Sequence, residues 1–232
     1  MAGEGSEAGG ADADVKIFFP AFAVVSFSLA GCTTASPGPA NLDPHKAELR
    51  RYVESGQYQS DIAAVATRAQ RWIEERIARR AAGERLTMVF DLDETLLSNW
   101  PFMLAEDLGG SDATWDAWLR AGKAPPIEPV RELYRRARQL GVEVLFLSTR
   151  QEHLHAATER NLRDIGCDHY AALILQPDNA KETAAAFKTA QRQRLVAEGR
   201  VLIANIGDQD SDLAGGYAER TFKLPDPFYL TP

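Results

Sequence analysis

The strongest constraint on the fold is an alternation along the chain after Gly83, in which short apolar runs are followed by amphipathic helical patterns. Each run is continuous, which is typical of strands buried on both faces of a parallel sheet. The runs span residues 86–91, 142–148, 171–175 and 201–207, and helical patterns at 129–140, 152–165 and about 182–198 lie between them. This order predicts an α/β fold built on a doubly wound parallel sheet with right-handed crossovers.

Two further segments belong to the same domain. Residues 43–85 carry apolar side chains at three- and four-residue spacing, which predicts N-terminal helical structure packed on the sheet. Residues 97–128 form a long connection that holds three of the four tryptophans, Trp100, Trp115 and Trp118. We expect this connection to be a small aromatic-rich cap inserted over the sheet edge, with most of its aromatic side chains in its own core and the others facing a ligand.

The first 42 residues differ in composition from the rest. Residues 17–30 are an apolar run of signal-peptide size, interrupted by Pro20 and too short to span a membrane as a helix. The run ends in Leu-Ala-Gly-Cys, which resembles the lipobox of bacterial lipoproteins. This resemblance implies a signal peptide over residues 1–31, lipid attachment at Cys32 and a tether over residues 32–42. A core segment that ends in an ordinary cysteine is the alternative.

The N-terminal segment also predicts where the protein is located in the cell. Residues 1–14 contain no basic residue, so a translation start at Val15 would give a more usual signal sequence. We expect a protein of the bacterial cell envelope that is anchored by lipid and faces the periplasm. The outer membrane is favoured over the inner one because no aspartate follows Cys32.

Composition excludes several classes of protein. The 232 residues are 45% hydrophobic and carry a net charge of -7, which fits one globular domain and argues against nucleic acid as a partner. Two cysteines, Cys32 and Cys167, cannot form a disulfide framework, so the fold depends on its core. Nothing in the sequence decides the oligomeric state.

Polar side chains follow the predicted strands at their carboxyl ends, where ligand sites form in open parallel sheets. They are Asp91 and Asp93 after the first strand, Ser148, Thr149 and Arg150 after the second, and Asp208 and Asp212 after the fourth. Clustered carboxylates repel one another and are costly to bury, so the set favours a bound divalent cation. Oxygen ligands without any His/Cys ligand spacing favour Mg²⁺ over Zn²⁺. The alternative is that these aspartates only cap helices.

These motifs, in this order, resemble a known family. "FDLDETLLSN", "FLSTR", a lysine before the last strand and "GDQDSDL" are similar to the haloacid dehalogenase (HAD) superfamily of phosphatases. The resemblance covers residues 43–232 and is greatest to the class B-like acid phosphatase branch, which contains bacterial outer-membrane lipoprotein phosphatases and plant vegetative storage proteins. It implies a HAD-like Rossmannoid fold and a Mg²⁺-dependent acid phosphatase that hydrolyses small phosphomonoesters through an aspartyl-phosphate. Among these esters we favour nucleoside monophosphates, because the aromatic insert offers side chains that stack on a base.

The resemblance also implies catalytic roles. Asp91 is the expected nucleophile, and Asp93 the expected general acid and then base. We expect Asp93 to take a proton more readily than an isolated aspartate, because a like charge lies beside it. Ser148 is expected to bind the phosphate. Lys188, with Lys181 as the alternative, is expected to neutralise Asp91 and the phosphoryl group.

Metal ligands are implied in the same way. Asp208 is expected to bind Mg²⁺ together with Asp91 and the backbone carbonyl of Asp93. Asp212 is expected to orient the lysine or a metal-bound water.

Three neighbouring residues have lesser expected roles. Thr95 is expected to support the loop that follows the nucleophile. Arg150 is expected to contact the phosphate or the structure around it, with a surface salt bridge as the alternative. Glu94 is expected to act only through helix-start electrostatics, without a part in the chemistry.

Two other functions stay open at this point. A phosphotransferase on the same fold would pass the phosphoryl group to an alcohol in place of water. A non-catalytic surface lipoprotein would keep the fold for binding alone. A histidine phosphatase is disfavoured, because His153 and His155 lack a matching arginine motif.

Overall fold

The computed structural model describes residues 41–231 of the chain. The expected signal peptide, the start at Val15 and the lipid attachment at Cys32 lie outside these residues and stay predictions. Within the described residues, no helix is both long enough and apolar enough to cross a membrane.

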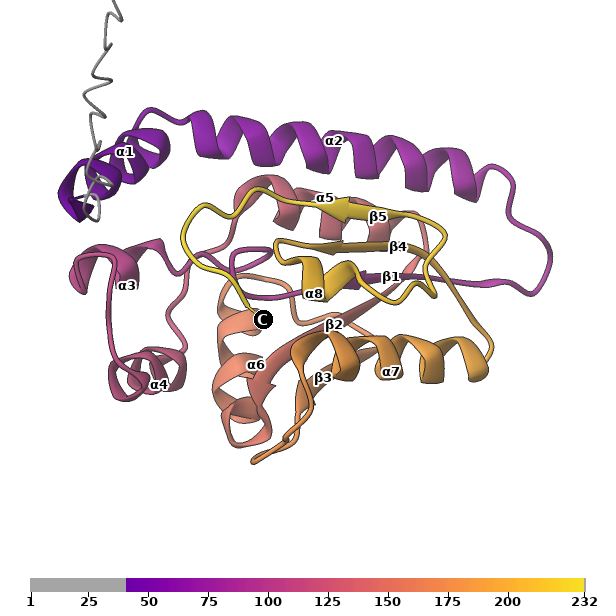
Figure 1. Ribbon diagram of the computed structural model, residues 1–232. Helices are drawn as coiled ribbons and strands as arrows, with labels where there is room; N and C mark the ends of the chain where they lie inside the picture. The colour runs from indigo at the N-terminus through magenta and orange to yellow at the C-terminus, as the bar shows by residue number, and fades with distance from the viewer. Residues whose placement is uncertain (1–40, 232) are drawn as a thin grey trace, which may run out of the picture. The chain divides into compact units, whose positions relative to one another are not determined.

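Five strands of the described chain form one parallel sheet in the order β3-β2-β1-β4-β5, as Figure 1 shows. The strands are β1 (Arg85–Phe90), β2 (Glu143–Gln151), β3 (Ala172–Gln176), β4 (Arg200–Gly207) and β5 (Thr221–Lys223). Phe90 at the end of β1 is level with Phe146 of β2 and Ile206 of β4. The carboxyl ends of the three central strands therefore meet at one edge, and the predicted α/β class is confirmed.

Helices cover both faces of this sheet. On one face, α5 (Glu128–Gln139) and α6 (His155–Asp164) pack with Met88 and Phe90 of β1 in the larger core. On the other face, α7 (Ala184–Ala197) packs with Val89 in a smaller core. Because successive side chains of a strand point to opposite faces, the continuous apolar run of β1 supplies both cores.

The N-terminal helical region is two helices, α1 (Leu42–Glu54) and α2 (Gln57–Ile77). They are separated at Gly56, whose φ of 81° is left-handed backbone that glycine adopts without strain. Figure 1 shows α2 alongside α5 and the β4–β5 side of the sheet. The Trp72 indole on α2 donates a 2.7 Å hydrogen bond to the carbonyl of Ile203 and so fixes α2 to β4. No residue of α1 is buried.

The connection from β1 to α5 holds α3 (Trp100–Ala105) and α4 (Asp112–Ala121). The Phe102 ring lies 5.2 Å from the Trp115 ring and 6.0 Å from the Trp118 ring, so these side chains form a small core of the insert. The Trp118 indole also donates a 2.7 Å hydrogen bond to Asn99. This bond fixes α4 to the residue that precedes α3.

His153 joins this insert to the sheet domain. It lies in the 3₁₀ helix η1 (Glu152–Leu154) after β2, with Nε2 3.0 Å from Asp116 Oδ1 and Nδ1 2.8 Å from Asp178 Oδ1. Asp116 belongs to α4 and also pairs with Arg120, whereas Asp178 follows β3. Only the imidazolium can donate from both ring nitrogens. The hydrogen bonds to Asp116 and Asp178 raise the pKa of His153.

This geometry gives a pH-dependent stability. The folded pKa lies above the ordinary value of 6.5, so the bridge contributes fully below that value and is lost as pH rises through the folded pKa. We expect the difference in free energy of unfolding between wild type and His153→Gln to be largest below the ordinary pKa of 6.5 and to shrink as pH rises above it, as measured by urea unfolding. His155→Gln is the control, because that ring has one carboxylate neighbour at 3.8 Å. A His153→Gln difference that does not change with pH would contradict the bridge.

Candidate active site

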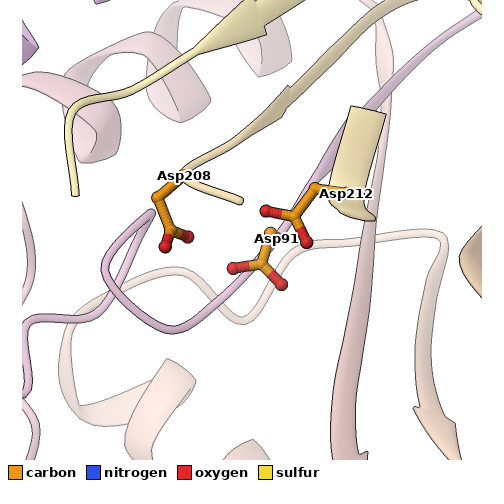
Figure 2. Close-up of side chains that lie close together, drawn as sticks. All are labelled: Asp91, Asp208 and Asp212. Carbon is orange, nitrogen blue, oxygen red and sulfur yellow. The ribbon is translucent and has the colours of Figure 1, made fainter. Parts of the chain in front are cut away.

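Three buried carboxylates meet at the carboxyl edge of the sheet. Asp91 follows β1, Asp208 follows β4, and Asp212 lies in the short helix α8 (Asp210–Leu213). One oxygen of each lies within 4.8 Å of the others, and Figure 2 shows the three carboxylates gathered in one place. Gly207 permits this approach, because a Cβ at that position would lie 2.4 Å from Asp212 Oδ2.

Lys188 is the cation in contact with this cluster. Its Nζ lies 2.5 Å from Asp91 Oδ1 and 2.5 Å from Asp212 Oδ1, and its side chain is buried. Lys181 is exposed and makes no ion pair among the described residues. Of the two candidate lysines, Lys188 is therefore the one that lies in the site.

One ammonium group does not balance three carboxylates. Burial raises the pKa of Asp91 to about 7, although Lys188 lowers it. Burial and the charge of Asp91 raise the pKa of Asp208 well above its ordinary value. Burial and the neighbouring carboxylates both disfavour the charged forms, and a bound cation would offset both effects. The donor set of carboxylate oxygens therefore fits a hard divalent cation.

Asp208 is held in place by two donors. The Thr95 hydroxyl donates to Asp208 Oδ1 at 2.9 Å, and the Gln209 side-chain amide donates to Oδ2 at 2.8 Å. Thr95 thus contacts the carboxylate after β4 from the loop after β1, 113 residues away in the chain. This contact is compatible with the expected role of Thr95 in supporting the loop after β1.

Asp93 does not join the cluster through its carboxylate, because that group pairs with Arg150. Arg150 Nε lies 2.9 Å from Asp93 Oδ2, and Nη2 lies 2.7 Å from Oδ1. Arg150 is 4% exposed, so the alternative of a surface salt bridge is wrong. Burial raises the pKa of Asp93, but the charge and hydrogen bonds of Arg150 outweigh burial and lower it overall. The expectation that Asp93 takes a proton more readily is therefore wrong for the free site.

Ser148 is buried at the end of β2, where its hydroxyl accepts a 3.2 Å hydrogen bond from the Arg150 backbone. Its neighbour Thr149 lines a small cavity of about 30 Å³ together with Asp91, Asp93 and Lys188. Phosphate binding by Ser148 stays a prediction, and Thr149 is a second hydroxyl residue at the same place.

Glu94 makes more structural contacts than expected for a residue that acts only through helix-start electrostatics. Its carboxylate is 1% exposed and accepts hydrogen bonds from the Asn99 backbone at 2.6 Å, the Asn99 side chain at 2.8 Å and the Tyr229 hydroxyl at 3.0 Å. Burial and the charge of Asp93 raise the pKa of Glu94 to about 8. Asn99 also donates to Asp93 Oδ1 at 2.9 Å. Glu94 therefore joins the loop after Asp91 to the C-terminal segment.

The C-terminal segment after β5 borders the site. The Phe228 ring lies 5.3 Å from the Tyr58 ring of α2 and 5.4 Å from the Trp100 ring of α3. The backbone of Thr231 donates to the Gln209 side chain at 3.0 Å. Tyr229 and Thr231 line the small cavity beside Asp91. No spacing pattern in the sequence points to these contacts, which join residues distant in the chain.

Like the C-terminal segment, Arg192 was not predicted from the sequence to lie near the site. It lies one turn after Lys188 on α7, is fully buried, and donates to the backbone carbonyls of Asp212 at 2.6 Å and Gly216 at 3.0 Å. It also donates to the carbonyl of Ala214. Arg192 therefore holds the loop that carries Asp212 against the helix that carries Lys188. The i, i+4 spacing from Lys188 is the signal that could have found it.

A groove of about 530 Å³ leads away from the cluster. It shares Asp93, Thr149 and Tyr229 with the small cavity. Its other walls come from α1, from the insert and from the C-terminal segment, and they include Phe102, Met103, Leu108, Trp115, Leu119 and Phe228. Trp118 does not line the groove, so of the two tryptophans of α4 only Trp115 faces it.

Comparison with known proteins places the chain in one group. A family model described as HAD superfamily, subfamily IIIB (Acid phosphatase) matches residues 34–232. Vegetative storage protein 1 of Arabidopsis thaliana is 35% identical over 205 residues, which cover 83% of this chain and 74% of that protein. Acid phosphatase 1 of Solanum lycopersicum is 38% identical over 146 residues, which cover 61% of this chain and 57% of that protein.

A solved structure has the same fold. The class C acid phosphatase from Bacillus anthracis aligns with a TM-score of 0.69 at 20% sequence identity, over 82% of this chain and 86% of that one. The shared fold places the sheet and its covering helices in a common arrangement.

Proposed function

This chain belongs to the acid phosphatases of the HAD superfamily, subfamily IIIB, and from that membership we propose that it hydrolyses small phosphomonoesters with Mg²⁺ through an aspartyl-phosphate on Asp91. The observation that carries the proposal is the buried contact of Asp91 with Lys188, beside Asp208 and Asp212. A carboxylate at the end of the central strand is there paired with a cation and borders a cavity.

In the first step, an oxygen of Asp91 forms a bond to phosphorus while the bond from phosphorus to the ester oxygen breaks. The departing oxygen takes a proton from Asp93, so the alcohol leaves neutral. Arg150 holds Asp93 ionised in the free site. The negative charge of an incoming phosphate raises the pKa of Asp93, so we propose that Asp93 takes up its proton as the ester binds.

In the second step, water attacks phosphorus and passes a proton to Asp93, while the bond from phosphorus to Asp91 breaks. Inorganic phosphate leaves, Asp93 releases to solvent the proton that it took up as the ester bound, and Asp91 is again a free carboxylate. Lys188 offsets the charge of Asp91 and of the phosphoryl oxygens in both steps.

Phosphatases of the HAD superfamily generally use a divalent metal ion. We assign Asp91, Asp208 and the backbone carbonyl of Asp93 as the groups that would hold Mg²⁺ here, with Asp212 orienting Lys188. When bound, the ion supplies positive charge to the phosphoryl oxygens. It would also offset the burial and the carboxylate repulsion that together raise the pKa values of Asp91 and Asp208.

For the alcohol part of the substrate we propose a nucleoside. The groove next to Asp93 is large enough for one and is lined by aromatic side chains, which stack on bases. Of the two tryptophans of α4, we assign stacking to Trp115. Trp118 instead packs against Phe102 and donates a hydrogen bond to Asn99.

The assay uses p-nitrophenyl phosphate, adenosine 5′-monophosphate and glycerol 2-phosphate as substrates. We expect hydrolysis of all three with Mg²⁺, a higher kcat/KM for the nucleotide than for glycerol 2-phosphate, and a loss of at least about 100-fold after removal of metal by EDTA. Mg²⁺ should restore the activity. Full activity in EDTA would contradict the metal assignment, and no hydrolysis of any ester with Mg²⁺ would contradict the proposed function.

We further propose a lipid-anchored location in the bacterial cell envelope. The support is the Leu-Ala-Gly-Cys sequence that ends at Cys32 and the polar segment that follows it.

A further inference from the structure

One face of α1 forms a wall of the groove. Leu42, His45, Lys46 and Leu49 all line it, at the i, i+3, i+4, i+7 spacing that places side chains on one side of a helix. Aromatic side chains of the insert, Phe102 and Trp115, line the same groove. A leaving group that fills the groove would therefore contact α1, whereas a small one held at Asp93 would not reach it.

The two halves of α1 are attached to the domain in different ways. Near its C-terminal end, Tyr52 and Val53 pack against the larger core, and the Tyr52 hydroxyl donates a 2.7 Å hydrogen bond to Asp61 of α2. The preceding part of α1, residues 42–50, is attached through polar contacts to Asp107, which lies between α3 and α4. Lys46 Nζ is 2.6 Å from Asp107 Oδ2, and Arg50 Nη2 is 2.6 Å from Oδ1.

The ion pairs with Asp107 are exposed and therefore contribute little to stability. The Asp107 side chain is 67% exposed, and exposed ion pairs contribute little and are screened by salt. Among the described residues, the hydrogen bonds that join residues 42–50 to the rest of the domain both end on Asp107. Loss of these contacts would therefore cost little free energy, and a ligand that contacts α1 would favour the position in which they are made.

We propose that the ion pairs of Lys46 and Arg50 with Asp107 form a latch that holds α1 as a wall of the groove, and that this latch sets the affinity for bulky leaving groups. The inference rests on the proposed function for its substrates. It assigns specificity to three charged residues outside the cluster of Asp91, Asp208 and Asp212. The chemistry at phosphorus stays independent of the latch.

The test compares Asp107→Asn with the matched control Glu106→Gln, whose side chain makes no ion pair among the described residues. We expect the KM of Asp107→Asn for adenosine 5′-monophosphate to rise about fivefold, the size of two exposed ion pairs, with kcat changed less than about twofold. KM for glycerol 2-phosphate should not change, and Glu106→Gln should match wild type. Added NaCl should raise KM for the nucleotide in wild type more than in Asp107→Asn, because only wild type has ion pairs to screen.

Equal effects of Asp107→Asn on both substrates, or no effect on either, would overturn the latch while the phosphatase activity stands. If wild type hydrolyses neither ester, the proposed function fails, and hydrogen exchange decides the latch separately. The amides of residues 42–50 should exchange faster in Asp107→Asn than in wild type, while those of α2 keep their rates. Unchanged exchange in residues 42–50 would overturn the latch.

Discussion

Asp91→Asn is expected to lower kcat for p-nitrophenyl phosphate with Mg²⁺ by at least about 10⁴-fold, because an amide cannot replace a carboxylate that forms a bond to phosphorus. Asparagine keeps the size of the side chain at the end of β1, so the fold should persist. The lower kcat would then result from the loss of the attacking carboxylate and not from unfolding. Initial rates at saturating substrate measure it, with circular dichroism as the check on folding.

Asp210→Asn is the control for this experiment. Asp210 belongs to the same "GDQDSD" motif as Asp208 and Asp212, but its side chain is fully exposed. We expect its kcat to match that of wild type. An Asp91→Asn variant with a kcat near that of the control would show that another group attacks phosphorus.

Lys188→Met is expected to lower both activity and stability. Lys188 is buried between Asp91 and Asp212, so its removal leaves two buried carboxylates without their cation. Removal of one partner of a buried ion pair costs about 3–5 kcal/mol of unfolding free energy. Urea unfolding in EDTA measures this loss, because chelation prevents a metal ion from replacing the missing ammonium.

Two further variants test whether unpaired buried charge causes the loss of unfolding free energy in Lys188→Met. Lys188→Met combined with Asp212→Asn should recover part of the lost unfolding free energy, because fewer buried charges then lack a partner. Lys181→Met should have the stability of wild type, because Lys181 is exposed. Wild-type stability in Lys188→Met would contradict the assignment of Lys188 as the buried counter-charge.

The main sheet could be predicted because its strands are buried on both faces. The expected strand over residues 86–91 and the observed β1 (Arg85–Phe90) differ by one residue at each end. Such strands give continuous apolar runs, which are easy to recognise. β5 gives no such signal, because Phe222 is its one buried side chain. In the N-terminal helical region, α2 gives a clear apolar pattern, whereas α1 gives none because no residue of α1 is buried.

The meeting of Asp91, Asp208 and Asp212 could be predicted because the topology of a parallel sheet brings the carboxyl ends of its strands together. The partners of Asp93 and Glu94 could not. The contact of Asp93 with Arg150 spans 57 residues of sequence, and that of Glu94 with Tyr229 spans 135. Such contacts depend on where side chains lie after packing, and no local pattern encodes them.

The proposed mechanism requires that Asp91 carries the phosphoryl group as an acyl phosphate during turnover. Borohydride reduces an acyl phosphate to an alcohol, so the wild-type enzyme would be quenched with it during turnover of p-nitrophenyl phosphate and then digested with trypsin. The tryptic peptide over residues 86–120 contains Asp91 and can be sequenced by mass spectrometry. We predict homoserine at position 91 in the sample quenched during turnover, and aspartate there in the sample without substrate. Unmodified Asp91 during steady turnover, or homoserine at another position, would contradict the account.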